Sequence, residues 1–230
     1  MWCMCASLSI QCHRGERMKL SILLTGVGGH GILTAASILG KASLKAGYNV
    51  LVSEVHGMAQ RGGIVNCNVR IGDVYSPLIP KGGADVIIST EPIEALRQID
   101  KANEKTLIIT DVNPVIPPTI YFSETSYPEV EKVLEELGRT CKLCAINAGE
   151  LAKEAGNVLA KNVVLLGALS AFDVLPFDSS LLLETIAESL PYKEVNTRAF
   201  KLGEEEVRKK YKGINMRRSQ TGKRDEIILR

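Results

Sequence analysis

The 230-residue sequence has no apolar run long enough to cross a membrane. A spanning helix needs about 20 apolar residues, and the longest apolar stretch, around residues 163–172, has roughly half that length. A secretory signal carries positive charge before its apolar part, whereas Arg14 and Arg17 follow the apolar part here. We therefore expect a cytoplasmic protein that makes no membrane contact.

The sequence also lacks the patterns of several enzyme classes. It contains no Ser-His-Asp order, no phosphate-binding Walker loop and no cluster of metal ligands. Hydrolytic and metal-dependent mechanisms are therefore disfavoured, and we expect no metal site in this chain.

Six cysteines are present without the four-cysteine spacing that holds an iron–sulfur cluster. Cys141 and Cys144 form a lone C-x-x-C at the start of an expected strand, whereas the redox motif joins a strand to a helix. Cys67 lies inside another expected strand, an apolar setting that argues against a redox role. Reduced thiols in a cytoplasmic protein are the favoured interpretation.

Charge and periodicity divide the chain into three parts. Residues 1–17 show neither helical nor strand periodicity, and we expect either a non-native extension, with Met18 as the natural start, or a disordered segment. From Arg208 onward nine Lys/Arg face two Asp/Glu, which leaves 19 basic and 24 acidic residues before it. Because the basic tail, residues 208–230, has Tyr211 as its only aromatic and no nucleic-acid-binding module, we expect it to be solvated or to contact a protein. Residues 18–207 then form one α/β domain with C-terminal helices.

Short apolar runs alternate with helical segments along residues 18–207. A strand at 20–25, a helix at 32–46 and a strand at 49–54 predict a βαβ unit with a right-handed crossover and a parallel strand pair. Residues 65–71 alternate apolar and polar side chains, which predicts a strand with one face either wet or packed on polar groups. The direction of this strand is not fixed by the sequence. Further strands are expected at 85–90, 106–110 and 141–146, and further helices at 127–137, 148–155, 162–172, 179–190 and 191–211. The predicted fold is a three-layer α/β/α domain with a mostly parallel central sheet, which the strand at 65–71 can make mixed, and a helical C-terminal cap.

A glycine-rich loop follows the first expected strand. Gly26-x-Gly28-x-x-Gly31 matches the dinucleotide-binding fingerprint, with Glu54 at the end of the second strand. Glycines at such positions let backbone N–H groups approach an anion at a helix N-terminus. A self-contained NAD-binding Rossmann-type dehydrogenase is therefore one candidate function.

A second polar loop, residues 53–63, follows the second expected strand and weakens the dehydrogenase interpretation, because a plain nucleotide-binding domain does not need it. Arg61, flanked by Gly62 and Gly63, offers a planar cationic fork to a phosphate or carboxylate, or alternatively forms an internal salt bridge with Glu54. His56 is a candidate general base, although a histidine in such a loop more often has a structural role, so we assign no catalytic residue.

Several runs resemble the gamma domain of 2-oxoacid:ferredoxin oxidoreductases over about residues 18–205. The most specific is Glu54-Val55-His56-Gly57-Met58-Ala59-Gln60-Arg61-Gly62-Gly63, which is similar to the indolepyruvate branch of that family. Further matching runs are 26–31, 69–72, 91–97, 162–169 and 196–203. The sequence departs from the family at His30, where glutamine is common, and at Ile64, where a small hydroxyl residue is common.

The resemblance implies a non-autonomous subunit. The family oxidatively decarboxylates a 2-oxo acid, here indolepyruvate or another arylpyruvate, with coenzyme A, and yields acyl-CoA, CO2 and reduced ferredoxin. Thiamine diphosphate, Mg and 4Fe-4S clusters are expected on a larger alpha subunit, with no cofactor bound by this chain alone and ferredoxin reached through the complex. The residues expected to face the partner subunit or coenzyme A are Gly26, Gly28, Gly29, His30, Gly31, Glu54, His56, Gln60, Arg61, Gly62 and Gly63.

Overall fold

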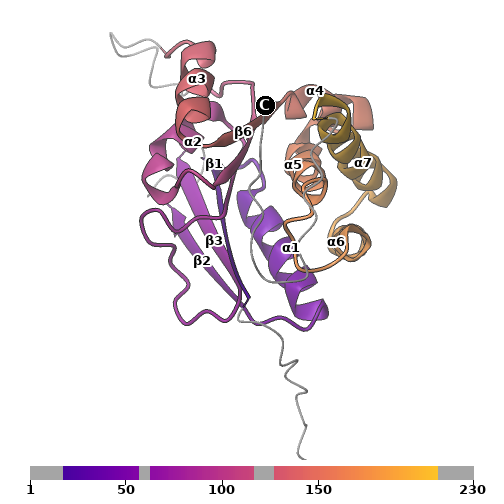
Figure 1. Ribbon diagram of the computed structural model, residues 1–230. Coiled ribbons are helices and arrows are strands. Elements are labelled where there is room, and N and C mark those ends of the chain that lie inside the picture. The colour runs from indigo at the N-terminus through magenta and orange to yellow at the C-terminus, as the bar shows by residue number, and fades with distance from the viewer. Residues whose placement is uncertain (1–17, 57–62, 117–126, 212–230) are drawn as a thin grey trace, which may run out of the picture.

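The computed structural model of the chain describes residues 18–56, 63–116 and 127–211 (Figure 1). The expected extension at residues 1–17 and most of the basic tail lie outside the described residues. The described part is built around a six-stranded sheet with the strand order β2-β3-β1-β4-β5-β6. Its strands are β1 Lys19–Val27, β2 Val50–His56, β3 Ile64–Gly72, β4 Val86–Ser89, β5 Leu107–Asp111 and β6 Lys142–Ile146.

The sheet is mixed because β3 runs against both of its neighbours. Strand β3 pairs antiparallel with β1 and with β2, whereas β1, β4, β5 and β6 form consecutive parallel pairs. The expected mixed sheet is thereby confirmed. The expected direct pairing of the first two strands is wrong: β1 and β2 are parallel in direction, but β3 lies between them.

The side chains of β3 explain its central position. Cys67 and Val69 are fully buried in the core on one face of the sheet. On the other face Asn66 accepts a hydrogen bond from Thr25 on β1, at 2.6 Å, and Asn68 donates one to Ser53 on β2, at 3.1 Å. The alternating sequence predicted a face that is either wet or packed on polar groups, and Asn68, only 6% exposed, follows the second alternative. The polar face of β3 therefore finds its partners on both neighbouring strands instead of in water.

Helices cover both faces of the sheet (Figure 1). Helices α2 and α3 lie on one face, and α1 lies on the other together with the C-terminal helices α4 to α7. Their bounds are α1 Ile32–Lys45, α2 Pro92–Arg97, α3 Val130–Thr140, α4 Ala148–Ala155, α5 Lys161–Ser170, α6 Ser179–Ser189 and α7 Lys193–Lys210, with short 3-10 turns at Ile99–Lys101 (η1) and Val158–Ala160 (η3). The three-layer fold with a helical C-terminal cap is confirmed. Within the described ranges no helix combines the length and the apolar character of a membrane span.

Side chains cap three helices at their N-termini. Glu91, Asn147 and Asp178 accept hydrogen bonds from backbone N–H groups in the first turns of α2, α4 and α6. Such caps satisfy donors that have no partner inside the helix. Helix α3 begins at Val130 rather than at the predicted Tyr127. The Tyr127 hydroxyl instead donates to Glu91 Oε1, which holds this residue outside the helix.

The end of α7 lies against the outer edge of β6. Lys210 Nζ donates to the Ala145 carbonyl at 2.6 Å, and the Tyr211 hydroxyl donates to the Leu143 carbonyl at 3.4 Å. Lys142 N–H bonds back to Thr106, so alternate residues of β6 face β5 and the carbonyls of Leu143 and Ala145 face away from it. The two side chains therefore occupy acceptors on the open edge of the sheet.

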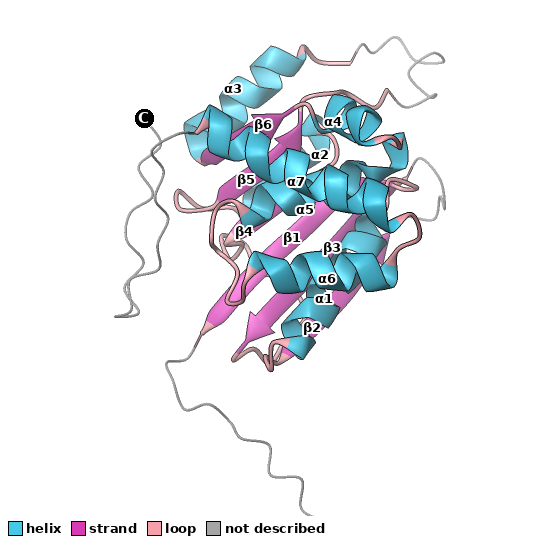
Figure 2. Cartoon of the chain, turned by 90° about the vertical axis from the view of Figure 1, so that its right-hand side faces the viewer, coloured by secondary structure: helices cyan, strands magenta, loops and turns pink. Residues whose placement is uncertain are grey.

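Helix α5 crosses α7 with the two backbones in contact. Each of the ten residues of α5 but the first is buried, and α7 packs across it (Figure 2). A Cβ atom on Gly167 would lie 2.0 Å from the Phe200 carbonyl oxygen, and one on Gly203 would lie 2.0 Å from the Val164 carbonyl oxygen. Only glycine permits this approach at either position.

We expect Gly203→Ala to lower the free energy of unfolding by about 3 kcal/mol, because the added methyl group forces two backbones apart in a packed core. Gly138→Ala is the matched control. Gly138 is exposed in α3, and the nearest atom to an added Cβ would be 3.9 Å away. Alanine there should stabilise the helix by about 0.5–1 kcal/mol. Urea unfolding midpoints measure both changes, and equal midpoints for the two variants would contradict the close crossing.

Candidate functional site

The glycine loop and the start of β3 meet at the carboxyl edge of the sheet. Val27 and Ile64 are register partners, and the N–H group of Gly28 donates to the Gly63 carbonyl at 2.8 Å. The second loop thus returns to the sheet directly beside the glycine loop. Gln60, Arg61 and Gly62 lie outside the described residues, as does the side chain of His56 at the end of β2.

Two glycines of the first loop are required by packing inside the protein. At Gly26 a Cβ atom would lie 2.0 Å from Thr90 Oγ1. Gly31 has a φ of +73°, and a Cβ there would lie 2.6 Å from Asn162 Nδ2, which donates to the Gly31 carbonyl. Gly29 differs from both: it is exposed, its φ is +99°, and no atom of the described residues lies within 4 Å of its missing Cβ. The loop is therefore held at both ends and open at its centre.

Glu54 does not occupy the position that the dinucleotide fingerprint requires. It lies on β2 and pairs with Cys67 of β3, so β3 separates it from the glycine loop on β1. Two strand spacings amount to about 10 Å. In a Rossmann domain the acidic residue that binds the ribose ends the strand next to the glycine loop. The residue spacing matches the dinucleotide-binding fingerprint, but the strand order argues against an NAD-dependent enzyme.

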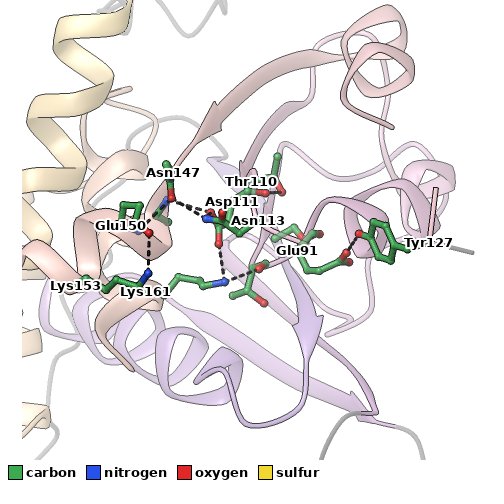
Figure 3. Close-up of polar contacts among 12 residues, drawn as sticks. Glu91, Thr110, Asp111, Asn113, Tyr127, Asn147, Glu150, Lys153 and Lys161 are labelled. Carbon is green, nitrogen blue, oxygen red and sulfur yellow. Dashed lines mark hydrogen bonds and ion pairs between the residues drawn. The ribbon is translucent and has the colours of Figure 1, made fainter. Parts of the chain in front are cut away.

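A polar cluster joins the carboxyl ends of β4, β5 and β6 to α5 (Figure 3). Lys161 Nζ lies 2.6 Å from Asp111 Oδ2 and donates to the Thr90 carbonyl at 3.2 Å. Asp111 is fully buried, and its other carboxylate oxygen accepts from Asn113 Nδ2 at 2.9 Å and from the Ala148 N–H at 3.1 Å. The single amino group of Lys161 thus ties the first turn of α5 to the ends of two strands.

His30 lies beside this ion pair. Burial lowers the pKa of His30 below its usual value of 6.5, the positive charge of Lys161 lowers it further, and Asp111 partly offsets both effects. Its Nδ1 atom is buried and has no hydrogen-bond partner among the described residues. His30 is therefore a neutral imidazole at pH 7, held between the glycine loop and the cluster.

The described cysteines are buried thiols. Burial raises the pKa of Cys67 and of Cys144 to about 12, and it raises the pKa of Cys141 as well. A protonated thiol is a poor nucleophile and a poor metal ligand. In the part of the chain that the structure describes, no three His, Cys, Asp or Glu residues gather closely enough to hold a metal ion.

Sequence analysis missed the residues that organise this edge. Thr90 directly follows β4, Asp111 ends β5 and Asn113 comes two residues later. Polar residues at such positions are a usable signal because the ends of parallel strands share one edge. In the sequence, Lys161 is a single charged residue that stands before a long apolar run. Its contact with Asp111, 50 positions away, has no local signature in the sequence.

We expect Lys161→Ala to lower the free energy of unfolding by about 3 kcal/mol, because it leaves the buried Asp111 carboxylate without its countercharge. Lys153→Ala is the control, since Lys153 forms an exposed ion pair with Glu150 in α4. Its effect should stay within about 0.5 kcal/mol. Chemical denaturation compares the two, and a loss no larger for Lys161→Ala would refute the structural role of the buried pair.

The lowered pKa of His30 predicts a pH dependence of stability. The native state binds fewer protons at this side chain than the unfolded state does, so its contribution is complete above pH 6.5 and is lost as the pH falls through the lower, folded pKa. We expect His30→Gln to lose less stability than the parent protein between pH 7 and pH 5. Urea titrations at both pH values provide the measurement, and identical losses would show that His30 does not titrate differently on folding.

Comparison with known proteins identifies the family. The model of the pyruvate ferredoxin/flavodoxin oxidoreductase family matches residues 21–206. An indolepyruvate oxidoreductase subunit IorB from Archaeoglobus fulgidus is 45% identical over 81% of this chain and 94% of its own length. A 2-oxoglutarate synthase subunit KorC from Methanothermobacter marburgensis is 28% identical over 82% of this chain and 96% of its own.

Two solved structures share the fold. The gamma subunit of a keto/oxoacid ferredoxin oxidoreductase from Geobacter sulfurreducens superimposes with a TM-score of 0.61 at 22% identity, over 82% of this chain and 98% of that one. A 2-oxoglutarate:ferredoxin oxidoreductase from Magnetococcus marinus, solved with 2-oxoglutarate, coenzyme A and succinyl-CoA bound, gives 0.62 at 22% identity, over 84% of this chain and 32% of that one. The extent of the family match and the identity to the Archaeoglobus subunit show that this chain belongs to the pyruvate ferredoxin/flavodoxin oxidoreductase family, as a subunit of its gamma type.

Proposed function

We propose that this chain is the smaller, non-autonomous subunit of an oxidoreductase that converts indolepyruvate or a related arylpyruvate, with coenzyme A, into an acyl-CoA, CO2 and reduced ferredoxin. The substrate class rests on the gradient of similarity, since identity falls from 45% for the indolepyruvate subunit to 28% for the 2-oxoglutarate subunit. The complex works in the cytoplasm.

The observation that carries the non-autonomous role is the size of the proteins that share this fold. The fold makes up 98% of the Geobacter gamma subunit but 32% of the Magnetococcus chain, so it occurs both as a separate chain and as one part of a larger one. A separate chain of this kind supplies one part of a divided enzyme. In this proposal thiamine diphosphate, Mg and the 4Fe-4S clusters are held by a larger alpha subunit, and ferredoxin is reached through the complex.

The carboxyl edge is the surface that would meet the alpha subunit or coenzyme A. Gly29 lies in the open centre of the loop, before the N-terminus of α1, where backbone N–H groups favour an anion. The Gly28–Gly63 hydrogen bond brings the return of the second loop to the same place. In this proposal Arg61, Gln60 and His56 also face the partner subunit or coenzyme A at this edge. Glu54 faces the same partner from β2.

We expect Arg61→Ala to lower the turnover of the assembled complex more than tenfold, about 1.4 kcal/mol of transition-state stabilisation. Its guanidinium group would otherwise pair with a phosphate or carboxylate at the interface or on coenzyme A. Arg139→Ala is the matched control, because Arg139 lies on the exposed face of α3 and pairs only locally with Glu135 and Glu136.

Ferredoxin reduction by the purified complex measures both variants, with assembly checked by size-exclusion chromatography. Turnover within twofold of the parent complex, with assembly intact, would remove Arg61 from the proposed role. Indolepyruvate oxidation by the isolated chain with NAD as acceptor would contradict the proposed function as a whole.

A further inference from the structure

Large apolar side chains are exposed where α4 meets α5 and where α6 meets α7. Val158 is 55% exposed, Leu159 is 74% exposed and Tyr192 is 72% exposed. Both connections lie on the same side of the helical layer, toward the right in Figure 2. They adjoin each other, because η3 contacts α7 and a Cβ on Gly156 would lie 3.8 Å from Val195 Cγ2. These three residues are called the apolar patch below.

The backbone holds Tyr192 in an unfavourable conformation. Its φ of 57° and ψ of 55° lie in the left-handed region, which costs a residue with a side chain about 1–2 kcal/mol. Asn196, which is only 8% exposed, fixes the turn by donating from Nδ2 to the Pro191 carbonyl at 2.6 Å and to the Tyr192 carbonyl at 3.3 Å. The fold therefore holds the Tyr192 backbone in a strained conformation while its side chain is exposed to solvent. Strained residues of this kind concentrate at functional positions.

Charged residues surround the apolar patch, and Lys193 and Glu194, which directly follow Tyr192, are exposed. Glu154 on α4 lies 3.9 Å from Arg198 on α7, and Lys153 lies 2.7 Å from Glu150. An apolar centre with a polar rim is the anatomy of a protein interface, and tyrosine is among the residues that most often anchor one. The surface therefore suits a partner that presents an apolar centre surrounded by polar or charged residues.

The apolar patch also borders the candidate site. Leu159 precedes Lys161 by two residues, and Lys161 binds the Thr90 carbonyl and Asp111 at the carboxyl edge. A large partner seated on the patch can therefore extend over the glycine loop. A second copy of this chain seated on the patch would also reach the glycine loop, but it would bring no cofactor to the candidate site.

We propose that the apolar patch docks the larger alpha subunit, with Tyr192 as the anchoring side chain and Val158 and Leu159 as its apolar surroundings. This inference rests on the proposed function, because that function requires a larger partner.

The test measures the affinity of the full-length chain for the co-produced alpha subunit. We expect Leu159→Asp and Tyr192→Ala each to raise the dissociation constant at least tenfold, which corresponds to about 1.4 kcal/mol. Leu44→Asp is the control, because Leu44 is 61% exposed at the far end of α1. It should change the affinity less than twofold, and thermal melting of the isolated variants checks that each one folds.

Three results would overturn the inference. Parental affinity in both patch variants removes the docking role and leaves the proposed function standing. Parental chain that binds no alpha subunit at all removes the proposed function together with the docking role. Self-association of the parental chain that Leu159→Asp abolishes, with the alpha subunit still bound, assigns the patch to a second copy instead.

Discussion

The position of β3 between β1 and β2 is the constraint on which the candidate site depends. It forces the second loop to return beside the glycine loop, where the Gly28–Gly63 hydrogen bond joins them. It also moves Glu54 one strand away from the place where a dinucleotide-binding domain keeps its acidic residue. The same pairing therefore brings the two loops together and takes Glu54 away from the position at which a dinucleotide-binding domain contacts the ribose.

The edge owes its rigidity to contacts between residues far apart in the chain. Lys161 reaches Asp111 and the Thr90 carbonyl, and Asn162 reaches Gly31. Both side chains start from the first turn of α5, which α7 fixes through a crossing that admits only glycine. The C-terminal helices are thus more than a cover for the sheet, because they set the shape of the glycine loop.

Local patterns in the sequence were sufficient for the fold class and for most elements. The predicted helix at 148–155 coincides with α4, since its capping Asn147 and its closing Gly156 are local signals. Strand order depends on contacts between residues far apart in the sequence. The alternating pattern of β3 therefore did not predict which strands lie beside it. The sequence did not decide whether the polar face of β3 meets water or polar groups, because the partners of Asn68 and Asn66 lie on other strands. The family resemblance supplied the function, which composition and spacing alone did not determine.

The Lys210 and Tyr211 contacts make the two margins of the sheet unequal. On the β6 side two acceptors are already occupied by the chain's own side chains, so a foreign strand that approaches there must first displace the end of α7. Continuous growth of the sheet from one molecule into the next is thereby hindered at this margin. The β6 margin is thereby protected against the edge-to-edge pairing through which exposed strands aggregate.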